Sequence, residues 1–511
     1  MKHPCDEAVI AAGAAAARCK ESAEPWILAA TILGSSMVFI DGTVVNVALP
    51  ALQASLRATV VDVQWIVESY ALFLAALLLV GGALGDRFGR KRIFSLGVAL
   101  FALASAWCGL APDVDQLIVA RAVQGVGGAL LVPGSLAIIS ASFSKEKRGQ
   151  AIGTWSGFTA ITAAVGPVLG GWLIEHVSWR AIFFINVPLA AVVLALVFRH
   201  VPESRDGDGA YGLDWPGAAL ATVSLGAIVY GLIESSPAAL IGGAVLFAAF
   251  LLVEKRSRHP MLPLSLFRSK DFSGANLLTL FLYTALAGAM FFLPLNLIQV
   301  QGYTATAAGA AMLPFILIMS ALSRWSGGLV KRFGARTPLV IGPAVTALGF
   351  TLFLRPGVGG SYWTTFFPAV VVLGLGMAVS VAPLTTAVMN AVESNRAGIA
   401  SGVNNAVSRT AGLLAIAALG LVMLQGFNHS LDRRPAGLKL PASERARLGA
   451  AEAPALADPG TRRMVKHAVA EAFVDGFHRV MLIAAVLALL SSAVAWLFIT
   501  ADPAPPRPSR R

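Results

Sequence analysis

Charge is the first thing that this sequence has little of. Only 13% of its 511 residues are Asp, Glu, Lys or Arg, whereas 57% are hydrophobic. Soluble globular proteins carry about 25% charged residues. The mean hydropathy of +0.74 points the same way. The composition excludes an ordinary soluble domain and predicts an all-α polytopic membrane protein.

Cysteine is also scarce. The chain has three, Cys5, Cys19 and Cys108, and this odd and scattered set excludes a disulfide framework. The seven histidines show no spacing typical of metal ligands, so we expect no metal site. The net charge of +12 would suggest nucleic acid in a soluble protein, but the basic residues lie between apolar segments. We therefore expect no nucleic-acid partner.

Three catalytic or nucleotide-binding patterns are missing as well. The sequence has no G-x-x-x-x-G-K-[ST] pattern, so ATP is not expected to drive it. It also lacks the H-E-x-x-H pattern of zinc proteases and the G-x-S-x-G pattern of serine hydrolases. We expect that the protein is not an enzyme and uses no cofactor.

Long apolar runs are what the sequence does have. Fourteen of them are long enough to cross a bilayer as helices, and the eighth is the shortest. The runs are 26–48, 65–84, 93–111, 116–138, 150–173, 181–198, 216–233, 238–253, 274–297, 306–329, 338–354, 364–387, 397–424 and 478–499.

The distribution of Lys and Arg predicts the topology. Basic residues are concentrated in every second connection, and only Arg57, Arg180 and Arg355 fall in the short connections between them. The positive-inside rule therefore places both termini in the cytoplasm. The segment 426–476 is an exception, but long segments determine topology weakly. We expect it outside, with one or two helices lying at the surface.

An internal repeat predicts the domain organisation. The sequence G-A-L-G-D-R-F-G at 82–89 recurs as G-G-L-V-K-R-F-G at 327–334, each time after the second span of a group of six. This favours two parallel six-helix repeats with an inserted hairpin between them. The predicted parts are a cytoplasmic tail (1–24), a first bundle (25–199), a linker with the inserted hairpin (200–254), a second bundle including the outer loop (255–499) and a disordered tail (500–511).

Three charged residues fall inside the first four spans. At 1.5 Å per residue, Asp41 in span 1 lies roughly 5 Å outside the midplane, and Glu68 and Arg121 in spans 2 and 4 lie roughly 9 Å outside it. Ionisable residues within a span are costly and usually face a partner or a water-filled cavity. Two carboxylates and one arginine in one layer predict a proton-coupling cluster. The alternative is that the two acids are merely interfacial.

The connection at 82–92 is glycine-containing and strongly basic. It begins at Gly82. Gly85 and Gly89 allow a sharp turn, and Asp86 lies beside Arg87 and Arg90. The isolated acid predicts a defined partner. A turn that only sets topology is the plainer interpretation.

The fifth span is rich in glycine. Gly157 pairs with Gly153, and Gly166 with Gly170, at the small-xxx-small spacing that lets helices approach closely. Pro167 removes a backbone donor and bends the helix, and Gly171 follows. Taken alone, such a pattern reflects ordinary membrane packing more often than function.

Taken in order, these motifs resemble the fourteen-span drug:proton antiporters of the major facilitator superfamily, the EmrB and QacA group. The resemblance covers about 26–425 and includes D-G-T-V-V-N-V-A-L-P, the loop at 82, R-A-V-Q-G-V-G-G, G-P-V-L-G-G, F-F-I-N-V-P and G-I-A-S-G-V-N-N. It implies the major facilitator fold, proton coupling through Asp41 and Arg121, antiport through the span around Pro167, and gating through Asp86.

We expect a multidrug efflux transporter of the bacterial inner membrane. It would exchange an amphipathic organic compound for protons, by alternating access, with lipid as its other partner. The sequence leaves open whether a periplasmic adaptor and an outer-membrane channel also take part. Polar points expected in a substrate cavity are Asn46, Gln124, Asn276, Asn296, Asn404 and Asn405.

Two other functions remain open from the sequence. A dedicated exporter of one metabolite, siderophore or antibiotic would have the same motifs. A membrane receptor or scaffold would not transport, and it would not need carboxylates and an arginine at one depth.

Overall fold

The computed structural model describes residues 23–205, 214–257, 260–392, 397–433 and 459–500. The regular elements within these residues are all helices, and no strand occurs among them. Helices are the expected outcome for apolar spans, because a backbone in hydrocarbon must satisfy its own hydrogen bonds. The expected tails at 1–24 and 500–511 lie almost wholly outside the described residues.

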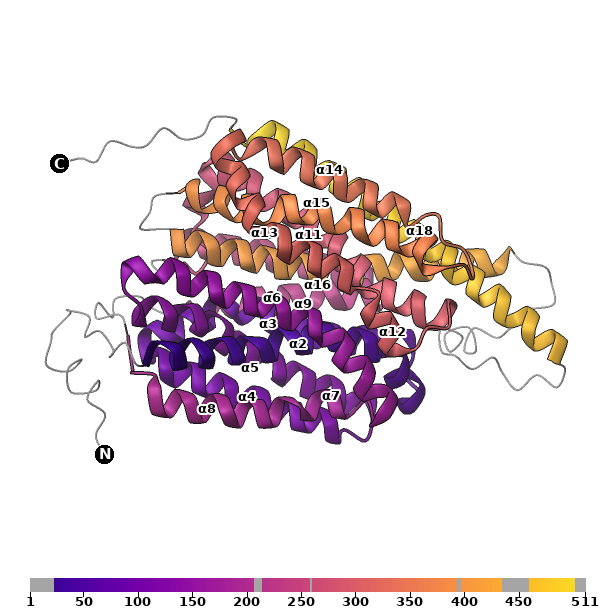
Figure 1. Ribbon diagram of the computed structural model, residues 1–511, viewed down its shortest axis with the longest axis horizontal. Coiled ribbons are helices and arrows are strands. Elements are labelled where there is room, and N and C mark those ends of the chain that lie inside the picture. The colour runs from indigo at the N-terminus through magenta and orange to yellow at the C-terminus, as the bar shows by residue number, and fades with distance from the viewer. Residues whose placement is uncertain (1–22, 206–213, 258–259, 393–396, 434–458, 501–511) are drawn as a thin grey trace, which may run out of the picture. The chain divides into compact units, whose positions relative to one another are not determined.

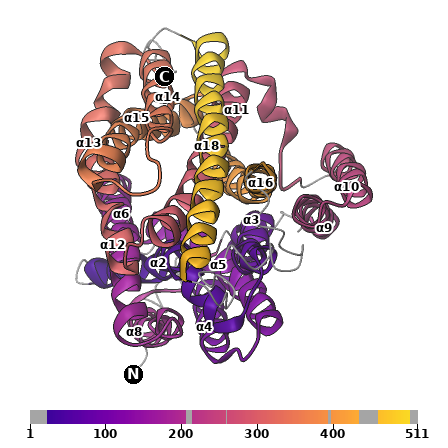
Figure 2. The ribbon, with the colours of Figure 1, turned by 90° about the vertical axis from the view of Figure 1, so that its right-hand side faces the viewer.

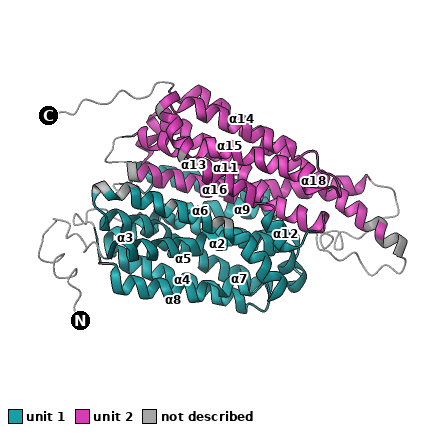
Figure 3. Cartoon of the chain, in the orientation of Figure 1, with its two compact units in different colours: residues 1–262, 303–310, 443–451 teal, residues 263–302, 311–442, 452–511 magenta. Residues whose placement is uncertain are grey.

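The chain divides into two compact units (Figure 3). Unit 1 comprises 1–262, 303–310 and 443–451. Its described helices are α2 (Glu24–Leu56), α3 (Val60–Phe88), α4 (Arg90–Leu110), α5 (Val114–Ser142), α6 (Lys145–His176), α7 (Ala181–Phe184), α8 (Asn186–His200), α9 (Trp215–Ile233), α10 (Pro237–Arg256) and α12 (Ala305–Ala310).

Unit 2 comprises 263–302, 311–442 and 452–511. Its described helices are η2 (Leu264–Arg268), α11 (Lys270–Leu295), the π-helical η3 (Asn296–Val300), α13 (Leu313–Phe333), α14 (Arg336–Leu352), α15 (Tyr362–Asn390), α16 (Ala397–Asp432) and α18 (Pro459–Phe498).

Twelve helices in the described part of the chain are long and apolar enough to cross a membrane. The other two expected spans, 150–173 and 338–354, coincide with α6 and α14, which are not among the twelve. Helix α14 has only 17 residues. The count of fourteen spans therefore stays a prediction.

Within unit 1, α2, α4, α5 and α8 run side by side (Figure 1). Helices α9 and α10, the expected inserted hairpin, pack against each other, and α9 also packs on α3 (Figure 2). The core of this unit is a cluster of apolar side chains that includes Met37, Leu74 and Phe101, all buried. It holds α2, α3, α4 and α5 together.

Local sequence explains where these helices begin. At the start of α3, the Thr59 side chain accepts from the Asp62 backbone N–H and the Asp62 carboxylate accepts from the Thr59 N–H at 2.7 Å. This reciprocal arrangement satisfies donors that a helix N-terminus leaves unpaired. Asp113 and Ser144 cap α5 and α6 in the simpler way, through one side-chain oxygen each.

The ends of the expected outer loop 426–476 differ from the prediction. Helix α16 continues to Asp432 and α18 begins at Pro459, so both flanks of the loop are extensions of spans rather than separate surface helices. Phe427, Leu431 and Ala472 pack the two extensions together. A polar cavity of about 480 Å³ lies beside them, lined by His429, Ser430, Arg433, Asp475 and Arg479. Residues 434–458 lie outside the described part.

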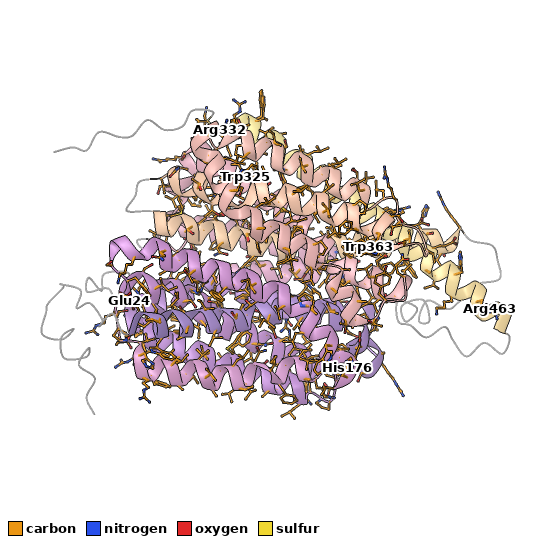
Figure 4. All side chains as sticks on the ribbon, in the orientation of Figure 1. Glu24, His176, Trp325, Arg332, Trp363 and Arg463 are labelled. Atoms are coloured by element: carbon orange, nitrogen blue, oxygen red, sulfur yellow. The ribbon has the colours of Figure 1, made fainter. Side chains whose placement is uncertain are left out.

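Large apolar side chains remain on the outside of the helices (Figure 4). Trp325 on α13 is 58% exposed and Trp363 on α15 is 67% exposed. Such exposure is costly in water and favourable in contact with lipid tails. The exposed surface is therefore consistent with a protein that is surrounded by lipid.

Candidate functional site

The centre of the site is a buried ion pair between α2 and α5. The Nη1 atom of Arg121 lies 2.5 Å from Oδ2 of Asp41. Both side chains are withdrawn from solvent, with relative exposures of 1% and 0%. The sequence predicted that these two residues lie close together, and the structure shows this contact. Their role in proton coupling stays a prediction.

Gln124 completes this ion pair. Its Nε2 donates to Asp41 Oδ1 at 2.8 Å, and its Oε1 accepts from Arg121 Nη1 at 2.6 Å. Arg121 Nε also donates to the Ile66 carbonyl at 3.1 Å. Gln124 was expected to line a substrate cavity, but in the structure it bridges the two charges. Its single amide both donates and accepts, which keeps the carboxylate and the guanidinium at a fixed separation.

Two further residues of the network escaped the sequence analysis. The Ser105 hydroxyl on α4 accepts from Gln124 Nε2 at 3.2 Å and from Asn186 Nδ2 at 2.9 Å, and it donates to the Phe183 carbonyl at 2.9 Å. Both side chains are fully buried. Their polarity at similar depth in spans 3 and 6 was the available signal, and Asn186 stands within the quoted F-F-I-N-V-P motif.

Aromatic rings enclose the guanidinium. The Arg121 Cζ atom lies 4.2 Å from the centre of the Tyr70 ring and 5.9 Å from that of Phe183. A cation above an aromatic face is attracted by the ring's quadrupole, and the attraction is larger where water is excluded. The rings thus offset part of the cost of burying the charge, and they shield the pair from solvent.

Glu68 does not join this network. Its side chain is fully buried, but neither carboxylate oxygen has a hydrogen-bond partner among the described residues. The prediction placed it beside Arg121. On α3, Ile66 and Tyr70 are the residues that contact Arg121, and Glu68 lies two positions from each, about 200° away around the helix axis. The residue shares the depth of the ion pair but faces another direction.

The loop between α3 and α4 has a partner that the sequence did not suggest. Asp86 pairs with Arg90, one turn away, at 2.8 Å. Glu203 accepts from the Lys91 backbone N–H at 3.1 Å and lies 3.6 Å from Arg92. Gly89 has φ +110°, a conformation that only glycine adopts without strain. The connection that follows α8, which contains Glu203, therefore holds this loop in place.

The other residues of the loop are more loosely placed. Arg87 lies over its neighbour Phe88, with 5.3 Å from Cζ to the ring centre. A Cβ atom added at Gly82 would come no closer than 3.6 Å to Pro133, and one at Gly85 would have its nearest neighbour at 4.0 Å. These two glycines are not needed for close packing here. The gating role of the loop stays a prediction.

Helix α6 uses its glycines on two sides. A Cβ atom added at Gly166 or Gly170 would collide with Thr43 or Val44 of α2. One added at Gly171 would lie 2.5 Å from the backbone of Thr306 in α12, and Gly309 packs against the Pro167 carbonyl. The close approach predicted for Gly157 is wrong, because nothing lies within 4 Å of the space that its Cβ would occupy.

The residues proposed to line a substrate cavity fall into different surroundings. Asn404 donates to Thr279 at 2.7 Å and to Asn276 at 3.2 Å, and Asn276 is buried in unit 2. Asn296 is buried and accepts from Gln301 at 3.2 Å. Asn46 is half-buried and Asn405 exposed. Their shared role as a cavity lining stays a prediction.

A comparison of sequences identifies the fold. The sequence profile described as Major Facilitator Superfamily matches residues 31–416. The chain belongs to this superfamily. It is therefore a multi-span membrane transporter, and the predicted all-α major facilitator fold is confirmed.

Two relatives of this superfamily member are named for drug resistance, and one of them also for export. The chain is 35% identical to the tetracenomycin C resistance and export protein of Streptomyces glaucescens, covering 94% of this chain and 92% of the relative. It is 36% identical to the multidrug resistance protein Stp of Mycobacterium tuberculosis (strain CDC 1551 / Oshkosh), covering 79% and 77%. The resemblance to drug exporters of the superfamily is thereby confirmed.

Solved structures agree on the fold. A bacterial homologue of the human lysosomal transporter Spinster, in an inward-facing and occupied conformation, superimposes with a TM-score of 0.65 at 17% identity. The match covers 94% of this chain and 98% of that one.

Proposed function

We propose that the protein is a proton-coupled antiporter that exports amphipathic organic compounds across the plasma membrane by alternating access. The observation that carries this proposal is the ion pair between Asp41 and Arg121, buried together with Gln124 in the first unit. A buried charge pair is weak evidence for stability, because desolvation offsets most of the attraction. Its presence inside a transporter therefore favours a functional role.

Protonation of Asp41 would change this network in a defined way. A neutral carboxyl group no longer balances Arg121, which also donates to the Ile66 carbonyl and to Gln124. An uncompensated buried charge is strongly unfavourable, so α2 and α5 would rearrange until Arg121 finds water or another acceptor. A proton taken up on one side and released on the other can thus be coupled to a change of conformation.

The names of the relatives support the proposed substrate class. Stp is named as a multidrug resistance protein, which favours a broad range of amphipathic compounds. The protein from Streptomyces glaucescens is named for one compound, tetracenomycin C, and it matches this chain over nearly its whole length. That match favours the second candidate, a dedicated exporter of a single antibiotic or metabolite.

The test is a proton-flux measurement with purified protein in sealed vesicles. Addition of a transported compound should move protons in the opposite direction, and Asp41→Asn should abolish this movement. The matched control is Asp62→Asn, which removes an acid from the α3 cap but not from the ion pair. If compounds cross without proton movement, the coupling proposal is wrong. If no compound crosses, the receptor or scaffold alternative stands.

A panel of chemically diverse compounds separates the two substrate candidates. A cell strain lacking its own pumps, with and without this protein, should become resistant to several unrelated amphipathic compounds if export is broad. Resistance to one scaffold alone would instead establish the dedicated exporter. Because the vesicle assay contains no other protein, transport there would also show that no periplasmic adaptor is required.

A further inference from the structure

Two carboxyl groups meet at one end of the hairpin formed by α9 and α10. Asp214 caps α9, and its Oδ1 accepts from the Gly217 backbone N–H at 2.8 Å. Glu254 lies two residues before the end of α10 and is only 2% exposed. Its Oε2 accepts from the Leu262 backbone N–H at 2.9 Å, and the Met261 backbone N–H also contributes.

The remaining oxygens of these two groups have no donor. Asp214 Oδ2 and Glu254 Oε1 are buried, and neither has a hydrogen-bond partner among the described residues. Both lie against Gly217, because a Cβ atom added there would be 2.6 Å from Glu254 Oε1 and 2.9 Å from Asp214 Oδ2. The two side chains interact directly with each other.

Such an arrangement is stable in only one protonation state. Two ionised carboxylates in a buried site repel each other, and each is left with an unsatisfied oxygen. One proton placed between them turns this repulsion into a hydrogen bond, as in other carboxyl pairs that share a proton. The buried oxygen of Glu254 needs this proton because the structure supplies no other donor to it.

We propose that Asp214 and Glu254 form a proton-binding site, in which one shared proton fastens the inner end of the hairpin to the chain at Met261 and Leu262. Lys255 and Arg256 follow directly, and the positive-inside rule places this end in the cytoplasm. The site lies outside the Asp41 network and does not depend on the proposed transport function. It responds to the pH of the cytoplasm.

The proton affects the connection between α10 and unit 2, because the site holds the residues that begin this connection. Leu262 is the last residue of unit 1 before the chain enters unit 2 at Pro263. Loss of the proton leaves two like charges, so the Glu254 carboxylate moves toward water and the Leu262 N–H loses its acceptor. The inner end of α10 and the connection into unit 2 then become more open.

Lys255 and Arg256, next to Glu254 on α10, are exposed. Asp214 is the titratable side chain that acts on Glu254, and residues 260–262 are Pro, Met and Leu. Helix α3 also packs on α9, but its acid at this end, Asp86, pairs with Arg90. A metal ion fits poorly, because no third His, Cys, Asp or Glu joins the pair among the described residues.

Hydrogen–deuterium exchange of the full-length protein in detergent tests this site. The peptide around Leu262 is followed between about pH 6 and about pH 9 and is corrected with the same peptide from unfolded protein. Protection should be high at the acid end and should be lost as the pH rises. In Glu254→Gln and in Asp214→Asn the new amide supplies the missing donor, so protection should persist throughout.

Controls separate the site from other causes of the pH response. Asp62→Asn changes an acid that already accepts two bonds from Thr59, and it should leave the response intact. Replacing sodium and potassium with choline should also have no effect, and a dependence on the metal cation would overturn the proton assignment. The proposal is likewise overturned if wild-type protection does not change with pH, or if both amide variants keep the response.

Infrared spectroscopy of the unaltered protein decides the matter even if a variant does not fold. The carbonyl band of a protonated carboxyl group should disappear over the same pH range in which protection is lost. A constant band over that range would show that no carboxyl group titrates there, and the site would be rejected.

Discussion

Arg121 on α5 donates to Asp41 on α2 across 2.5 Å, in a part of unit 1 where both side chains are hidden from solvent. Removing one partner of a buried pair leaves the other charge uncompensated and costs about 3–5 kcal/mol. We therefore expect Arg121→Leu to lower the stability of the protein by an amount in this range and to abolish export.

The double variant distinguishes charge balance from function. Asp41→Asn combined with Arg121→Leu removes both charges, so it should be more stable than Arg121→Leu alone and still inactive. Thermal unfolding in detergent and vesicle transport measure the two effects. If the double variant is no more stable than the single one, Asp41 is not the counter-ion of Arg121 in the folded protein.

Gln124 should act through the geometry of the ion pair. Gln124→Leu removes a donor to Asp41 and an acceptor from Arg121, leaving buried polar groups unsatisfied at a cost of about 1–3 kcal/mol. The control is Gln116→Leu, because Gln116 is exposed and its side chain donates to Asp113, outside the ion pair. Equal unfolding temperatures for the two variants would contradict the role given to Gln124.

The glycines of α6 should differ sharply when substituted by alanine. Gly170→Ala places a methyl group against Val44 and should destabilise the protein by about 1–3 kcal/mol, a typical cost of overpacking. Gly157→Ala meets open space and should be neutral or slightly stabilising, because alanine favours helix by about 0.5–1 kcal/mol over glycine.

A compensating substitution tests the contact with α2. Val44→Ala should restore most of the stability that Gly170→Ala loses, since it removes the side chain that the new methyl group would strike. Thermal unfolding of the three variants measures this directly. The packing assignment fails if Gly157→Ala is as damaging as Gly170→Ala.

Glu175 lies outside the expected span 150–173. We expect this residue to make the stability of the protein depend on pH. Partial burial alone would raise the pKa of its carboxyl group, but the Thr306 backbone N–H at 2.7 Å and the Thr304 hydroxyl lower this pKa below its usual value. Because the pKa is lowered in the folded protein, the Glu175 carboxylate stabilises the fold above about pH 4.3, the usual pKa of Glu. This stabilisation is lost as the pH falls through the pKa of the folded protein.

The variant Glu175→Gln should therefore be less stable than wild type at neutral pH, and the two should converge in acid. The difference will be small because the carboxylate is largely exposed to solvent. Unfolding temperatures measured from neutral to acid pH provide the check. A difference that grows as the pH falls would contradict the sign.

Topology is tested by reporter fusions along the chain. Fusions in 85–92, near residue 212, in 255–271 and at the C-terminus should report the cytoplasm, and fusions in 434–458 should report the outside. Fusions near 212 and 260 that report opposite sides would exclude an inserted hairpin between them.

Much of the fold could be predicted from the sequence because membrane helices are local structures. The apolar runs, their lengths and the intervening basic residues define each span without reference to its neighbours. The runs at 26–48 and 116–138 correspond to α2 and α5, and each helix is longer than the predicted run. Their depths also predicted that Asp41 and Arg121 would meet.

Direction around the helix axis was decided only by tertiary structure. Depth follows from counting residues at 1.5 Å each, but the face that a side chain presents depends on which neighbours pack against its helix. Glu68 has the right depth and turns away from the pair, whereas Gln124 bridges it. Ser105 and Asn186 belong to the network because α4 packs beside α5, and α7 and α8 pack in turn beside α4.

The glycines of α6 show the same division. The spacing of Gly157, Gly166 and Gly170 indicates that close approach is possible, since no Cβ atom stands in the way. Only the packing of α2 and α12 decided that Gly166, Gly170 and Gly171 are used and that Gly157 is not. A local pattern sets which contacts a helix can make, and the positions of its neighbours select among them.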